Sequence, residues 1–136
     1  MLVCDTSGLI AYFDASDAHH DEANAAVEAD SGPFVVSPYV LAELDYLLAT
    51  RRGVREELAV LTELASGAWD LPSCAEAEVR RAGKVIDTYR DQNIGLTDAS
   101  LVVLAASYRT DRLLTLDHRH FQVVRTLDGK PFTLLP

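Results

Sequence analysis

The chain has 136 residues, and 49% of them are hydrophobic, which is enough apolar material for the core of one domain. This composition excludes an intrinsically disordered chain, because such chains are poor in apolar residues. The longest apolar run, residues 101–106, is much shorter than the roughly 20 residues of a membrane-spanning helix. The start of the chain has no basic residue and meets an acid at Asp5, which is unlike a secretory signal. We therefore expect a single domain over residues 1–136 with no membrane segment.

Charge and cysteine content narrow the class of protein further. The chain has 21 acidic and 12 basic residues, a net charge of −9, which is the wrong sign for a passive nucleic-acid binder. Either the acidity only keeps the protein in solution, or some of the acids are ligands for divalent cations. Cys4 and Cys74 have neither a disulfide-framework nor a metal-ligand spacing, which favours the reducing cytoplasm.

Short apolar runs alternate with longer segments of helical periodicity, and Gly, Pro and Ser residues separate them. Ser37-Pro38 is typical of a helix start, Ser73 and Glu76 form a capping-box pattern, and Thr97 is in the position of a helix cap. In chain order, we expect a strand at residues 2–4, helices at 7–13 and 18–30, a strand at 34–36, helices at 38–52 and 54–65, a strand at 69–71, helices at 74–90 and 98–109, a strand at 113–116, and short strand candidates at 123–124 and 132–135.

Strands separated by helices indicate parallel pairing with right-handed crossovers. The sequence therefore predicts an α/β domain of three layers, in which helices flank a central, mostly parallel sheet. In such sheets ligands bind beyond the carboxyl ends of the strands, so acids at those ends are the first candidates for a site.

Two acids directly follow predicted strands. Asp5 comes after the first strand, and Asp117 comes after the fourth. An acid in this position is also an ordinary helix cap, so for either residue alone both interpretations stay open.

Glu43 and Asp98 lie within the apolar stripes of their predicted helices, and we expect both to face the core. A buried carboxylate is costly unless it has a basic partner or a metal, and the chain has only two lysines, Lys84 and Lys130. Both helices begin at the same sheet edge as Asp5 and Asp117, where converging carboxylates would repel one another without a cation. Oxygen ligands without nearby cysteine favour Mg²⁺ or Mn²⁺ over zinc.

These residues lie within motifs by which the chain resembles PIN-domain ribonucleases, and most of all the VapC toxins of bacterial type II toxin–antitoxin pairs. The matches run in the expected order over residues 1–121. The matching motifs are Asp5-Thr6-Ser7, Ser37-Pro38 followed by Ala42-Glu43-Leu44, Leu96-Thr97-Asp98-Ala99, and Leu114-Thr115-Leu116-Asp117. The resemblance implies a single PIN domain over the whole chain.

The resemblance also implies an acidic pocket in which Asp5, Glu43, Asp98 and Asp117 are catalytic and Thr115 supports them. Asp5 and Asp98 are then the principal ligands of Mg²⁺, for which Mn²⁺ substitutes, and the reaction is hydrolysis of an RNA phosphodiester. One departure is that many relatives have an acid where His120 stands here. Three arginines near the fourth strand are candidates for contacts with RNA phosphates: Arg112, Arg119 and Arg125.

The same resemblance implies partners and a cellular role. VapC toxins inhibit translation by cleaving structured RNA, either tRNA or ribosomal RNA, and they are usually homodimers. A VapB-type antitoxin silences them by laying its C-terminal segment in a groove beside the active site. The apolar stretch at residues 39–64 is a candidate for that groove.

Two other functions remain as alternatives. The first is a PIN-domain nuclease that processes RNA and is not a toxin. The second is a non-enzymatic α/β interaction module whose acids only cap helices. A phosphoacceptor receiver domain is disfavoured, because it needs a lysine at the end of a late strand, and neither Lys84 nor Lys130 is there.

Overall fold

Five short parallel strands form one sheet in the centre of the molecule, in the order β3-β2-β1-β4-β5. The computed structural model describes all residues 1–136. The strands are β1 (Leu2–Cys4), β2 (Phe34–Val36), β3 (Trp69–Asp70), β4 (Arg112–Leu114) and β5 (Thr133–Leu135). The chain order reverses between β1 and β4, so the site expected at a reversal of strand order lies at the ends of these two strands.

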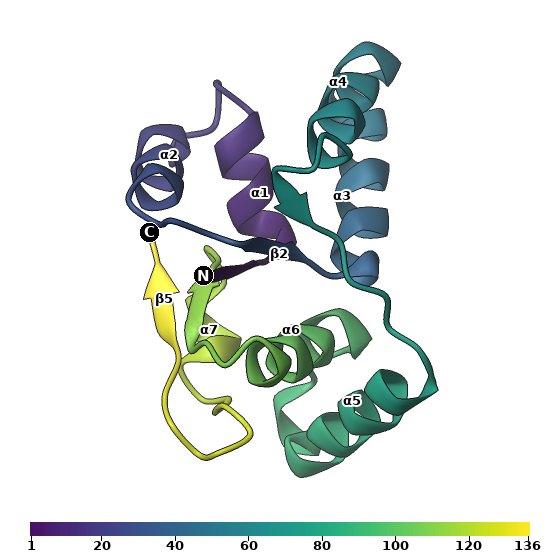
Figure 1. Ribbon diagram of the computed structural model, residues 1–136, viewed down its shortest axis with the longest axis vertical. Helices are drawn as coiled ribbons and strands as arrows, with labels where there is room; N and C mark the ends of the chain where they lie inside the picture. The colour runs from purple at the N-terminus through teal and green to yellow at the C-terminus, as the bar shows by residue number, and fades with distance from the viewer.

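Helices cover both faces of this sheet, with α1 to α4 above the strands in Figure 1 and α5 and α6 below them. The prediction of a three-layer α/β domain is therefore confirmed. No helix has both the length and the apolar composition that crossing a membrane requires. The helices are α1 (Thr6–Phe13), α2 (His20–Glu28), α3 (Pro38–Arg51), α4 (Val54–Leu64), α5 (Glu76–Thr88), the 3-10 turn η1 (Arg90–Gln92), α6 (Leu96–Ser107) and α7 (His118–Phe121).

The core lies around β1 and α6. Every residue of β1 is fully buried, because helices cover the central strand of a parallel sheet on both faces. Residues 99–105 of α6 are all buried as well, since this helix lies between the sheet and α5. The hydroxyl groups of Ser37 and Ser100 are 2.8 Å apart, which joins the start of α3 to the first turns of α6. The acids on these two helices are thereby held at the same end of the molecule.

The predicted caps of two helices are wrong. The helix α5 begins at Glu76, and the side chain that caps it belongs to Glu78, whose carboxylate accepts the Ala75 N–H at 2.9 Å. The capping box expected from Ser73 and Glu76 is therefore displaced along the chain. Likewise α6 begins at Leu96, so Thr97 lies in its first turn and does not cap it.

The strand expected at residues 123–124 is absent, and the helix α7 was not expected at all. The N–H groups of Gln122 and Val124 donate to the carbonyls of His118 and His120, so local helical hydrogen bonds replace strand pairing. Val124 is still buried, which explains why an apolar residue stands in this turn.

Gly8 allows α1 to approach the end of β4. A Cβ atom on Gly8 would lie 2.6 Å from the carbonyl oxygen of Leu114 and 2.7 Å from its Cγ. The same carbonyl accepts the backbone N–H of Asp5 at 2.9 Å. The lack of a side chain at Gly8 thus lets the residues after β1 and those after β4 share one small space.

We expect Gly8→Ala to lower the free energy of unfolding by about 1–3 kcal/mol, because the added methyl group meets backbone that cannot move freely. Gly83→Ala is the matched control, since Gly83 lies in α5 and an added Cβ there meets nothing within 4 Å. The free energy of unfolding of this control should rise by about 0.5–1 kcal/mol, because alanine has a better helix propensity than glycine. Urea unfolding of both variants measures the two changes, and similar changes in both would contradict the close approach.

Candidate active site

Asp5 is a buried acid whose two carboxylate oxygens both accept hydrogen bonds. It directly follows β1, caps the start of α1 and is only 7% exposed. Its Oδ1 accepts the Thr6 N–H at 2.7 Å, and its Oδ2 accepts the hydroxyl groups of Thr115 at 2.8 Å and Ser7 at 3.0 Å. Burial raises the pKa of Asp5, and these three hydrogen bonds oppose that rise by stabilising the charged form.

Thr115 and Ser7 connect the segment after β4 to the start of α1. Thr115 is fully buried, and while its hydroxyl donates to Asp5, it also accepts the backbone N–H of Asp117 at 3.0 Å. The Ser7 hydroxyl accepts the backbone N–H of Leu116 at 3.0 Å. These bonds fix the backbone that presents Asp117 and place Thr115 beside Asp5, while its role in catalysis stays a prediction.

The four predicted acids line one cavity of about 330 Å³ at the carboxyl ends of the central strands. The lining residues include these four acids, Asp5, Glu43, Asp98 and Asp117, together with Thr6, Ser7, Ile10, Asp17, Leu47, Arg51, Thr97 and Leu116. The structure therefore brings together residues from positions far apart in the sequence. Such a concentration of carboxylates favours binding of a cation or of a cation with its phosphate ligand.

Glu43 does not face the core, and that expectation is wrong. The buried stripe of α3 consists of Val40, Leu44 and Leu48, whereas Glu43 is exposed at the cavity. Glu43 neighbours this stripe in sequence but lies outside it. Its carboxylate is therefore available to water and to a ligand.

Asp98 lies in the first turn of α6, and its side chain is 23% exposed. Burial is the main cause that raises the pKa of Asp98 to about 6, and the negative charges of Asp5, Asp117 and Glu43 add to the rise. The nearby imidazole of His120 acts in the opposite direction.

His120 stands between two of the acids. Its Nδ1 lies 3.5 Å from Oδ2 of Asp98 and 3.3 Å from Oδ2 of Asp117, yet this buried nitrogen makes no hydrogen bond. The buried hydroxyl of Thr6, which lines the acidic cavity, has no partner either, whereas His120 contacts two of the cavity's acids without lining it. Unpaired buried polar atoms are rare in proteins, so the Thr6 hydroxyl is free to bind water or a ligand in this cavity.

The family of the protein follows from comparison with known proteins. The family described as PIN domain matches residues 2–126. This chain belongs to the PIN-domain family. It is 51% identical over 135 residues to "Ribonuclease VapC26" of Mycobacterium tuberculosis (strain ATCC 25618 / H37Rv), which covers 99% of this chain and 100% of that protein. The resemblance to VapC-type PIN domains is thus confirmed.

Solved structures with lower identity share the fold of this PIN domain. The VapC20 toxin of Mycobacterium tuberculosis, described as cleaving the sarcin-ricin loop, matches with a TM-score of 0.81 and 20% identity, over 88% of this chain and 92% of that chain. A toxin–antitoxin complex from Klebsiella pneumoniae matches with a TM-score of 0.73 and 19% identity, over 91% and 92% of the two chains.

The donor set of this PIN domain fits a hard cation that keeps much of its water. No three His, Cys, Asp or Glu side chains approach closely enough to enclose one ion. Zinc sites need three or four such protein ligands, whereas Mg²⁺ is usually held by one or two carboxylates together with water and substrate phosphates. Asp5 and Asp98 can provide those two carboxylates, and both line the open cavity.

The three predicted RNA-binding arginines are not brought together. Arg112 begins β4, away from the strand end that carries the acids, and its Nε lies 3.1 Å from the carboxylate of Asp30. Arg119 is exposed on α7 beside His120, and Arg125 lines a different cavity. Arg112 therefore does not line the acidic cavity, contrary to what its position near the fourth strand suggested.

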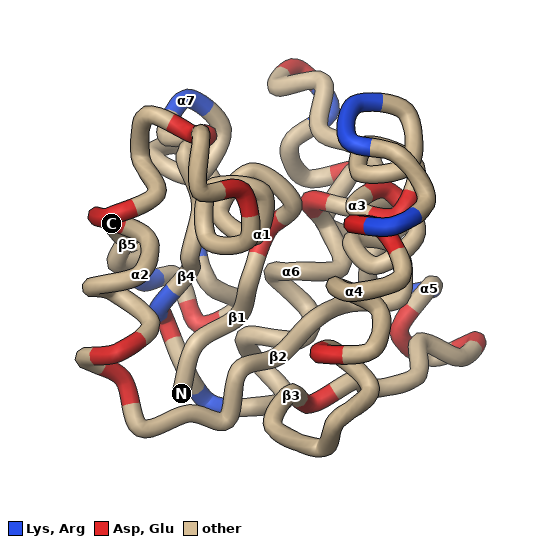
Figure 2. Tube along the Cα trace, turned by 90° about the horizontal axis from the view of Figure 1, so that it is seen from above, with Lys and Arg blue, Asp and Glu red and all other residues tan.

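The sequence interpretation missed Arg51, the basic residue that lines the acidic cavity. Figure 2 shows acidic positions over most of the chain and a small group of basic positions beside α3 and α4, where α3 ends. The helical spacing of Glu43, Leu47 and Arg51, each four residues from the next, places all three on one face of α3. That spacing is the signal from which Arg51 could have been found.

We expect the metal-free protein to lose stability between pH 4 and pH 7 because of Asp98. Its folded pKa of about 6 is above the unfolded value of about 3.9, so its stabilising contribution is present below pH 4 and lost as the pH rises through 6. Between pH 4 and pH 7, the free energy of unfolding of the wild type should fall by about 2 kcal/mol relative to that of Asp98→Asn. Urea unfolding in excess chelator measures the difference.

The control for this comparison is Asp91→Asn, which removes a charge from an exposed residue of η1 outside the cavity. Its pH profile should parallel that of the wild type. If the profile of Asp98→Asn also parallels that of the wild type, the pKa of Asp98 does not cause the loss of stability.

Proposed function

We propose that this PIN domain is a metal-dependent endoribonuclease and the toxin of a type II toxin–antitoxin pair. The observation that carries the proposal is the Asp5 carboxylate, buried and oriented by Thr115 and Ser7 at a cavity that Asp98, Glu43 and Asp117 also line. The 51% identity to a protein named Ribonuclease VapC26, over nearly the whole of both chains, supports the same activity.

In this proposal, the residues of the cavity have different roles in RNA hydrolysis. Asp5 and Asp98 would hold Mg²⁺, or Mn²⁺ in its place, which supplies a water of lowered pKa and neutralises the scissile phosphate. Thr115 and Ser7 keep the Asp5 carboxylate in one orientation through their hydrogen bonds. Glu43 and Asp117 flank the cavity and can orient the attacking water and accept its proton.

Arg51 is suited to bind the RNA at this cavity. Its guanidinium has no carboxylate within 4.0 Å, although acids line the same cavity, so it is free to donate to a phosphate oxygen. The substrate of this proposal is structured RNA, either tRNA or ribosomal RNA. The VapC20 toxin, which has the same fold, is described as cleaving the sarcin-ricin loop.

The partner of the proposed toxin is a VapB-type antitoxin, and its docking surface is the pair α3 and α4. Tyr46 is 66% exposed and Leu58 is 56% exposed on these helices, while Leu48 is buried and belongs to the core. Solved structures of this fold include VapBC complexes from Salmonella typhimurium and Rickettsia felis bound to DNA. The proposal also includes a homodimer in the cytoplasm.

We expect the purified protein to cleave structured RNA in Mg²⁺ and to stop in excess chelator. Asp5→Asn should abolish cleavage, because it removes a ligand charge while keeping the shape of the side chain. Thr115→Val should lower the rate by about 10- to 100-fold, since the Asp5 carboxylate loses a hydrogen bond that orients it. Gel assays of tRNA and ribosomal RNA measure cleavage, and Asp91→Asn should match the wild type.

Full cleavage by folded Asp5→Asn, with contaminating nuclease removed, would refute the assigned site. Expression without an antitoxin separates a toxin from an RNA-processing nuclease. A toxin arrests growth, Asp5→Asn relieves the arrest, and so does co-expression of the neighbouring antitoxin. A protein that cleaves RNA in vitro yet leaves growth unaffected would be a nuclease of another kind.

A further inference from the structure

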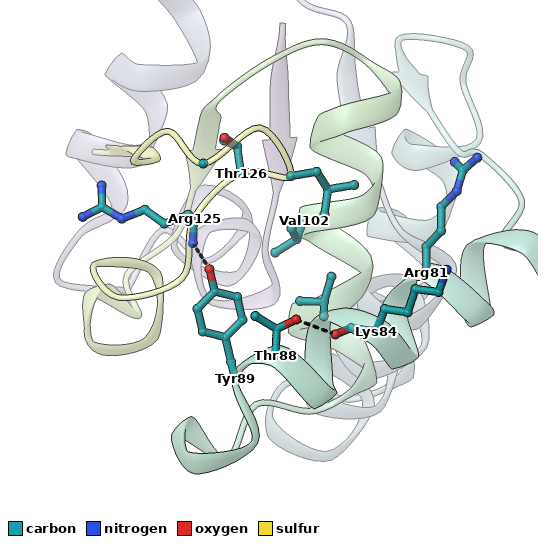
Figure 3. A pocket seen from close by; sticks show the side chains of 10 residues that line it. Arg81, Lys84, Thr88, Tyr89, Val102, Arg125 and Thr126 are labelled. Atoms are coloured by element: carbon teal, nitrogen blue, oxygen red, sulfur yellow. Dashed lines mark hydrogen bonds between the residues drawn. The ribbon is translucent and has the colours of Figure 1, made fainter.

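A second cavity, of about 390 Å³, lies between α5, α6 and the segment that follows α7. Figure 3 shows Arg125 and Arg81 on opposite sides of it, with Tyr89 and Thr88 between them. Lys84 also lines the cavity, and no acidic residue does. Three basic residues therefore line one hollow in a chain whose net charge is −9, and the guanidinium groups of Arg125 and Arg81 extend outward on opposite sides of it (Figure 3).

These basic side chains are free of ion pairs. Arg52, Arg90, Arg112 and Lys130 each have a carboxylate within 4.0 Å, whereas Arg81, Lys84 and Arg125 have none. An unpaired cation at the surface keeps its full attraction for an anion, because no neighbouring carboxylate has to be displaced. The cavity is thus complementary to a ligand with several negative charges.

The polar groups around Tyr89 also suit a phosphate-bearing chain. The Tyr89 hydroxyl accepts the backbone N–H of Arg125 at 3.0 Å, so it retains its own proton for donation to a ligand. Its ring is half-buried, and aromatic rings in basic grooves are the usual stacking surface for unpaired bases.

The basic cavity is connected to the acidic one through α6 and α7. Val102 contributes to the basic cavity and lies one turn, about 6 Å, further along α6 than Asp98. Tyr89 directly follows α5 and leads through the short turn η1 to the start of α6, so it is at the Asp98 end of the helix pair. Arg125 follows α7, whose His120 contacts Asp98.

We propose that this basic cavity, lined by Arg81, Lys84, Tyr89 and Arg125, binds phosphates of the RNA strand beside the cut site. The inference rests on the proposed ribonuclease function. The acidic cavity repels a polyanion except at a bound cation and at Arg51, so affinity for the rest of the strand has to come from basic side chains elsewhere. The basic cavity supplies three of them, and its Val102 lies one helical turn along α6 from Asp98.

The test compares two double variants that each remove two positive charges. Arg81→Gln with Lys84→Gln changes the cavity, while Arg55→Gln with Arg80→Gln changes exposed residues that do not line it. Arg80 is a close match, because it is the residue before Arg81 on the same helix. Binding of a short RNA is measured in chelator over a range of salt concentrations, so that no cleavage is needed.

In the cavity variant, the slope of log affinity against log salt concentration should fall by about 1.4, which is the loss of two contacts to a single strand. The control variant should keep the wild-type slope. In Mg²⁺, the cavity variant should show a raised KM and an unchanged kcat, because the acidic cavity is intact. Equal slopes in the two double variants would overturn the proposal.

Two further probes distinguish other anions from an RNA strand. Inorganic phosphate and polyglutamate are each titrated against the wild type and the cavity variant. If the cavity variant loses affinity for either probe but not for RNA, the cavity serves a free phosphate or an acidic protein segment, and the proposal is wrong. If the slope difference appears in a protein that cleaves no RNA, the RNA site stands and the proposed nuclease function fails.

Discussion

The carboxylate of Asp5 is buried where the two central strands end, and hydrogen bonds from Thr6, Ser7 and Thr115 keep it there. Burying a charge is costly, and only a set of donors in fixed positions can offset that cost. Those donors come from α1 and from the segment after β4, which can meet only because Gly8 leaves room for the Leu114 carbonyl. The parallel pairing of β1 with β4 and the packing of α1 therefore serve the placement of one side chain.

Around this fixed carboxylate, the other acids of the cavity are held less tightly. Glu43 and Asp117 have exposure to solvent, and the raised pKa of Asp98 records both its burial and its repulsion from Asp5. The mutual repulsion of these carboxylates is unfavourable, and under the proposed function a bound cation would relieve it. His120 lies within 3.5 Å of both Asp98 and Asp117, and its imidazole opposes the rise in the pKa of Asp98. The basic cavity beside α5 would balance the acidic one by holding the remainder of a polyanionic strand.

Much of the fold could be predicted from local sequence. The apolar runs at β1, β2 and β4 and the spacing of helical segments give the parallel α/β class, and the acids at strand ends give the edge where the site lies. Glu43 was placed in the core because helical spacing alone does not reveal where a buried stripe ends. Arg112 was misplaced because proximity in sequence to a strand does not tell which end of the strand a side chain occupies. The close approach at Gly8 and the basic cavity depend on contacts between distant segments, which no local pattern contains.

The most direct test of the proposed metal site is the change in stability when Mg²⁺ replaces chelator. At a Mg²⁺ concentration a hundredfold above its dissociation constant, the free energy of unfolding of the wild type should rise by about 2.7 kcal/mol. That of Asp91→Asn should rise by the same amount. Asp98→Asn should lose most of that gain, and its melting temperature in chelator should equal or exceed that of the wild type, because it lacks one of the repelling charges. An equal Mg²⁺ shift in the wild type and Asp98→Asn, or no shift in either, would contradict a cation held between Asp5 and Asp98.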